Sequence, residues 1–200
     1  MRTELALLLL LLGCSGPDAE VRSAPCVPAM DGAPAPTDLA TLESLFASAR
    51  AVVPELDGVS VTLTPAESET DFFFSNLDLT TLTAPPRERS YLAFYNSRLF
   101  EAPPSGPATV AILVHELAHV VDYTEMSSQE LAEFGVWYAT QDVAAYEHDT
   151  DLFAMERGCA PGLIGYREWL YDRIPADAVD EKKRVYYTPD EIRTWMIAGG

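Results

Sequence analysis

Three residues in the stretch from Val110 to Tyr123 have the types and spacing of a catalytic metal site: His115, Glu116 and His119, in the order H-E-x-x-H. On a helix, residues four apart lie on one face, so both imidazoles can point at one metal ion. The Glu116 carboxylate can then reach a water held at an open coordination position. The pattern therefore predicts Zn²⁺ bound by two histidines, with Glu116 as general base.

The residues around this motif favour a buried helix. From Ala108 to Val114 every residue except Thr109 is apolar. Titratable side chains rarely lie in such a segment without a partner. The alternative is an exposed helix on which the histidine spacing arises by chance. It would need a solvated stripe, for which the apolar flanks leave little room.

A catalytic zinc usually has three protein ligands. The only other histidine, His148, follows Glu147 directly. If Glu147 is the ligand, Asp151 lies one turn further along the same helix face, where it can accept a hydrogen bond from a ligand histidine. If His148 is the ligand, Asp151 has no such role. We favour Glu147, and His148 stays open as the alternative because histidine is the commonest metal ligand.

With Glu147 and Asp151 included, the chain resembles the gluzincin metallopeptidases, the thermolysin-like class, in which H-E-x-x-H is followed on a later helix by E-x-x-x-D. The resemblance rests on these two motifs. It implies a zincin-like fold, a peptide or protein substrate, and an edge strand that binds extended substrate, for which the candidate is Tyr91–Tyr95. The metzincins would instead place the third ligand at Glu125, but Asp122 replaces the glycine of their turn, which disfavours that reading.

Peptide hydrolysis also needs a hydrogen-bond donor for the oxyanion. The sequence offers four candidates and does not choose among them: His148, Tyr166, Tyr186 and Tyr187. For each tyrosine, a half-buried core position is the more typical role.

The first residues predict export and anchoring. Residues 1–13 read as a signal peptide, because the apolar run from Leu5 to Leu12 is too short to span a bilayer. The run ends at Gly13-Cys14, which resembles the lipobox of bacterial lipoproteins, although Glu4 departs from a purely basic start. The resemblance implies lipid on Cys14 and a place in the bacterial cell envelope, on the periplasmic or outer-surface side of a membrane. An ordinary signal peptide is the alternative.

Residues 14–36 are rich in Pro, Ala, Ser and Gly, which predicts a flexible tether between the lipidated cysteine and a domain at 37–200. Cys26 lies in this segment and Cys159 follows the second motif. In an oxidising compartment the two could form a disulfide, and two free thiols are the equal alternative.

Composition limits the class of partner. The formal net charge of −18 argues against nucleic acid and against electrostatic binding to anionic lipid, so a membrane contact would depend on the lipid anchor alone. The patterns predict helices over 38–50, 107–123, 127–141, 142–157, 163–173 and 188–198, with strands over 59–64 and 90–95. Residues 71–82 are ambiguous. This order predicts an α+β fold with a small, mainly antiparallel sheet followed by a helical half.

The sequence thus predicts a zinc-dependent metalloprotease that hydrolyses peptide bonds. A non-catalytic envelope lipoprotein, acting as a binding or scaffold module, is the alternative from another class. Glu116 argues against it, since a purely structural zinc has four protein ligands and no base. A cell-wall amidase on the same fold is a further alternative.

Overall fold

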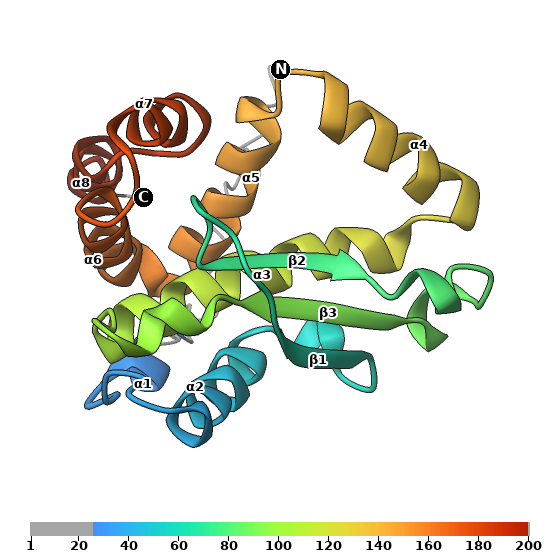
Figure 1. The fold of residues 1–200 in the computed structure, drawn as a ribbon, viewed down its shortest axis with the longest axis horizontal. Helices are drawn as coiled ribbons and strands as arrows, with labels where there is room; N and C mark the ends of the chain where they lie inside the picture. The colour runs from blue at the N-terminus through green and yellow to red at the C-terminus, as the bar shows by residue number, and fades with distance from the viewer. Residues whose placement is uncertain (1–25, 200) are drawn as a thin grey trace, which may run out of the picture.

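The computed structural model describes residues 26–199, and the predicted signal peptide and Cys14 lie outside that range. The fold is α+β, with a small sheet and a largely helical remainder (Figure 1). The helices are α1 Cys26–Met30, α2 Leu39–Val52, α3 Gly106–Glu125, α4 Ser128–Thr140, α5 Ala144–Ala154, α6 Ala160–Tyr171, α7 Ala176–Val185 and α8 Pro189–Ile197. The strands are β1 Ser60–Pro65, β2 Phe73–Leu77 and β3 Ser90–Tyr95. Within 26–199 no helix is long and apolar enough to cross a membrane.

The sheet has the order β1-β3-β2, with β3 parallel to β1 and antiparallel to β2. It is therefore mixed, and the predicted mainly antiparallel sheet is wrong in this respect. Alternation in the sequence predicts that a strand exists, whereas the neighbours of a strand depend on where the chain crosses. The expectation that 91–95 forms an edge strand is also wrong, because β3 is central and β2 is an edge.

One face of the sheet packs on α3. Tyr91, Ala93 and Tyr95 alternate along β3 and are buried on this face, and the Tyr91 hydroxyl donates to the main-chain oxygen of Tyr123 in α3. On the opposite face Phe94 stacks on Phe74 of β2, with ring centroids 4.6 Å apart. The period-two pattern that predicts β3 therefore also fixes which side chains reach the core.

Helix α3 is the centre of the molecule and is buried along almost its whole length. The Ser105 side chain accepts from the Ala108 N–H at its start, and Pro107 occupies the first turn. An apolar helix of this kind needs cover all round, and α2, α6 and the sheet supply it. Close packing against α6 requires Gly162, because a Cβ there would lie 2.6 Å from Ala111 Cβ.

The helical half follows the predicted order with one addition. Capping boxes begin α4 at Ser127 and α8 at Thr188, as the sequence predicts. Gly158 adopts a φ of 87° in the short π-helical segment Met155–Cys159, which lets the chain turn from α5 into α6. The sequence pattern does not predict α7, because Val185 is its only buried residue.

Part of the expected tether belongs to the folded unit. Cys26 and Met30 of α1 lie in the core, and Cys26 forms a disulfide with Cys159, with Cα atoms 5.3 Å apart. The backbone at Ala33 packs against Gly106 at the start of α3. The packed unit therefore begins before residue 37.

Candidate metal centre

His115, His119 and Glu147 come together between α3 and α5. Their candidate ligand atoms all lie within 4.8 Å of one another, and the three residues are buried. Glu147 Oε2 is 3.3 Å from His115 Nε2 and 3.4 Å from His119 Nε2. This group could hold a metal ion, and it is the one the sequence favours, with Glu147 rather than His148 as the third member.

Asp151 lies behind His115, on the side of the ring away from Glu147. Its Oδ1 lies 2.9 Å from His115 Nδ1 and accepts from Arg167 Nη2 at 2.9 Å, while Oδ2 accepts from the Tyr187 N–H at 3.0 Å. A carboxylate acceptor at Nδ1 favours the tautomer with its proton there, which leaves the Nε2 lone pair facing Glu147. Asp151 therefore lies where the sequence analysis expects it, beside the ring of a candidate ligand histidine.

Two tyrosines that the sequence analysis missed complete the surroundings. The Tyr146 hydroxyl lies 3.0 Å from His119 Nδ1, and the Tyr138 hydroxyl of α4 donates to Glu147 Oε1. With Oε1 engaged by Tyr138, Oε2 is the carboxylate oxygen free to bind an ion. No local pattern marks these tyrosines, because their roles depend on how α4 and α5 pack beside α3.

The arrangement fits a bound cation. Glu147 Oε2 is buried and has no hydrogen-bond donor among the described residues. It faces two histidine nitrogens, and converging lone pairs repel one another unless a proton or a metal cation lies between them. The balance of buried charge also favours a cation at this position. The site contains three buried carboxylates, Glu116, Glu147 and Asp151, and one buried guanidinium, Arg167. The two negative charges that remain would be neutralised by one divalent ion.

The acid–base properties agree with this balance. Burial acts to raise the pKa of Glu147, but the two histidines beside its carboxylate lower that pKa well below its usual value. Burial likewise acts against the charge on His115, yet the Asp151 carboxylate 2.9 Å from its Nδ1 raises the pKa of His115 to about 9 in the metal-free protein. The pKa of Glu116 is raised by burial, so this carboxylate is a better proton acceptor than an exposed one.

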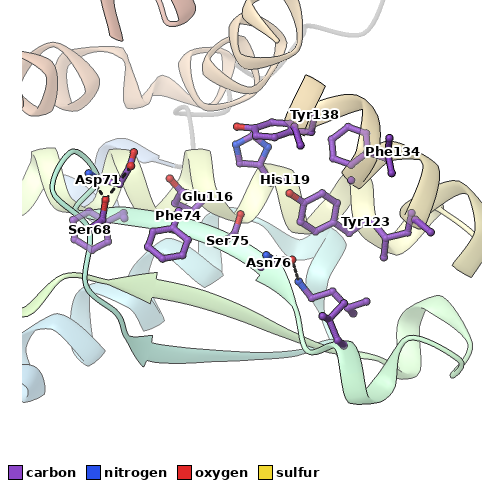
Figure 2. A pocket seen from close by; sticks show the side chains of 18 of the residues that line it. Ser68, Asp71, Phe74, Ser75, Asn76, Glu116, His119, Tyr123, Phe134 and Tyr138 are labelled. Carbon is purple, nitrogen blue, oxygen red and sulfur yellow. Dashed lines mark hydrogen bonds between the residues drawn. The ribbon is translucent and has the colours of Figure 1, made fainter. Parts of the chain in front are cut away.

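Glu116 lies beside the candidate metal position at the floor of a cleft of about 960 Å³. The cleft is formed by α3, β2 and α4, and Figure 2 shows Glu116 and His119 along α3 with Ser75 of β2 opposite them. A molecule in the cleft could therefore contact both the Glu116 carboxylate and a metal ion held by this group. The face of the metal position towards the cleft is the open one.

The predicted oxyanion donors separate into two groups. Tyr186 lines the cleft, with its ring 5.8 Å from that of His115. Tyr166 instead packs in the core against Trp169. His148 and Tyr187 stack on each other, with ring centroids 4.1 Å apart, and neither lines the cleft.

Both alternative third ligands lie away from the group. His148 is not among the clustered residues, and its ring is occupied by the stack on Tyr187. Glu125 is exposed at the last position of α3, which continues as a helix through Asp122 instead of turning. The structure thus favours neither alternative.

Comparison with known proteins returned no match: no family model, no curated protein and no solved structure resembles this chain closely enough to be significant.

Proposed function

We propose that this protein is a zinc-dependent metallopeptidase of gluzincin type on a small zincin-like fold. The observation that carries the proposal is the convergence of His115, His119 and Glu147 beside Glu116 on an open cleft. Three protein ligands and one open position are typical of catalytic zinc, whereas structural zinc has four protein ligands. Two histidines and one carboxylate suit zinc better than calcium or magnesium, which prefer oxygen ligands.

When bound, zinc would polarise the scissile carbonyl and acidify water. The protein's own residues supply the remaining steps. Glu116 accepts a proton from the attacking water and passes it to the leaving amine. Tyr186 lines the same cleft and is the candidate donor to the oxyanion, because the Tyr138 hydroxyl already donates to Glu147 Oε1.

The free edge of β2 supports a polypeptide substrate. The Asp78 N–H donates to Ser90 O beside β3, whereas the Leu77 N–H donates to its neighbour's side chain, Asn76 Oδ1. Backbone groups alternate in direction along a strand, so those of Ser75 also point away from β3. An extended peptide can pair with such an edge. The substrate-binding role proposed for 91–95 thus moves to β2.

We place the protein in the bacterial cell envelope, held by lipid on Cys14. The buried disulfide between Cys26 and Cys159 supports an oxidising compartment, because cytosolic proteins seldom keep such bonds. The anchor itself lies in the segment outside the described residues.

The test begins with zinc content. The full chain, purified in detergent, is analysed by elemental mass spectrometry as wild type, Glu147→Ala and His148→Ala. We expect one zinc per chain in wild type and His148→Ala, and little in Glu147→Ala. Absence of zinc from reconstituted wild type would refute the proposal.

Activity is then measured on an unbiased mixture of peptides, with Glu116→Gln as the inactive control. Cleavage by wild type that Glu116→Gln abolishes supports a peptidase. Release of fragments from peptidoglycan without peptide cleavage would favour the cell-wall amidase. Zinc binding with neither activity would leave the binding module.

A further inference from the structure

The two ends of the cleft, on either side of the candidate metal position, are lined by side chains of different chemistry. Figure 2 shows Asp71 and Ser68 at one end, Tyr123 and Phe134 at the other, and Glu116 and His119 between them. Apart from Glu116 and His119 at the metal position, the charged residues in the lining are Glu67 and Asp71. The end of the cleft beyond His119 is therefore lined without charge.

Apolar side chains dominate that uncharged end, and they remain open to solvent. Leu79 is 75 % exposed on one wall, and Val136 of α4 is 66 % exposed on the other. Helix α4 has no buried residue, although much of it is apolar. Large exposed apolar surface in a concave site usually marks a place where a ligand binds.

Aromatic rings connect this surface directly to the metal site. His119 and Tyr123 stack along α3, with centroids 6.4 Å apart, and Phe134 lies 5.8 Å from Tyr123 and 5.8 Å from Tyr138. A side chain placed against these rings would belong to a residue close to the scissile bond. The apolar surface is thus continuous with the site that we propose as catalytic.

The direction of β2 decides whether the apolar end of the cleft holds the substrate residues before or after the scissile bond. The strand runs from Phe73 near the acidic end to Leu77 near the apolar end. A peptide pairing antiparallel to it, the commoner arrangement, would run from the apolar end to the acidic end. Its residues before the scissile bond would then contact Tyr123, Phe134 and Leu79.

We propose that the cleft selects polypeptides with a large apolar side chain on the N-terminal side of the cleaved bond, through the wall formed by Leu79, Tyr123, Phe134 and Val136. This inference rests on the proposed peptidase function and names its substrate class. The wall carries no charge, so the substrate side chain that contacts it is expected to be apolar. The wall is continuous with the metal site, so that side chain belongs to a residue close to the cleaved bond.

The test maps cleavage positions in a degenerate peptide mixture by mass spectrometry, using the zinc-loaded full chain. Two peptides are then compared that differ only by Phe or Ser at the preferred position. In wild type, kcat/KM is expected to be about tenfold or more higher for the Phe peptide, the scale at which an apolar pocket discriminates.

Two exposed wall residues are changed together, Leu79→Ser and Val136→Ser, because neither supports the core. The Phe/Ser ratio should fall by about tenfold, through a larger loss of kcat/KM for the Phe peptide than for the Ser peptide. Ile197→Ser, on α8 and 87 % exposed, is the matched control and should leave the ratio unchanged. Val136→Lys should favour peptides with Asp or Glu at the substrate position where Phe and Ser are compared. A variant that had merely lost its fold would not gain this preference.

The outcomes separate this inference from the function on which it rests. Three results would overturn the inference and leave the peptidase proposal intact. The protein cleaves peptides without an apolar preference, it shows such a preference only after the cleaved bond, or the wall variants do not change the Phe/Ser ratio. If the zinc-loaded protein cleaves no peptide, the peptidase proposal fails and the substrate class fails with it.

Discussion

Replacing Asp151 by Asn tests whether the residues behind His115 set the affinity for metal. Asp151 is fully buried, and its carboxylate contacts His115 Nδ1, the Arg167 guanidinium and the Tyr187 N–H. The amide of Asn has the same shape but no charge and one acceptor oxygen. It therefore cannot serve all three donors, and it gives Arg167 no counter-ion.

The expected loss follows from the nature of these contacts. Removing an outer hydrogen-bond partner of a ligand histidine typically lowers metal affinity by about 10- to 100-fold. This corresponds to roughly 1.4 to 2.7 kcal/mol of binding free energy. Solvent does not screen the contact, because His115 and Asp151 are both almost completely excluded from water. We therefore expect the upper part of that range.

The assay is competition for zinc with a chromophoric chelator, which yields a dissociation constant for each variant. Asp149→Asn is the matched control, since Asp149 is an exposed aspartate on the same helix. A melting curve in saturating zinc confirms that each variant is folded at the assay temperature. Equal zinc affinities for wild type, Asp149→Asn and Asp151→Asn would refute the argument that Asp151 orients His115.

Three further predictions concern the base, the disulfide and pH. Glu116→Gln should keep its zinc while peptide hydrolysis falls by roughly 10²- to 10⁴-fold, measured as zinc content and initial rate on the same sample. Replacing Cys26 and Cys159 by Ala should lower the free energy of unfolding by about 2 to 5 kcal/mol in urea titrations, and reduction of wild type should reproduce the shift. The pKa of His115 rises from 6.5 to about 9 without metal, so its contribution to metal-free stability is present below 6.5 and lost as pH rises through about 9. Zinc must displace the proton on His115, so the affinity for zinc should rise with pH over the same window. Calorimetry at pH 7 in buffers of different ionisation enthalpy should detect the release of that proton. If no proton is released, His115 is not a zinc ligand with the raised pKa described here.

Local chemistry explains what the sequence could predict of the site. His115, Glu116 and His119 share one helix, and Glu147 and Asp151 share another, so helical periodicity alone places each set on one face. The capping boxes that begin α4 and α8 are similarly local, because all their hydrogen bonds join residues three apart. These features need no knowledge of how the helices pack.

Features that depend on packing between distant segments were beyond such reasoning. The prediction of a mainly antiparallel sheet is wrong because alternation does not specify the neighbours of a strand. For the same reason the edge strand is 73–77 and not 91–95. Tyr138 and Arg167 reach the site from α4 and α6, and neither has a spacing that marks it. Their roles exist only once those helices lie beside α5.

The charge balance of the site explains why the helices after the two motifs are needed. The motifs alone bring together three buried carboxylates, Glu116, Glu147 and Asp151, and would leave one more negative charge than a divalent ion can neutralise. Arg167 of α6 supplies the missing positive charge, and the Tyr187 N–H, from the link between α7 and α8, completes the hydrogen bonds of Asp151. Uncompensated buried charge is costly. A chain ending after α5 would therefore carry every candidate ligand and still hold the ion weakly, because the residues that neutralise and orient those ligands come later in the sequence.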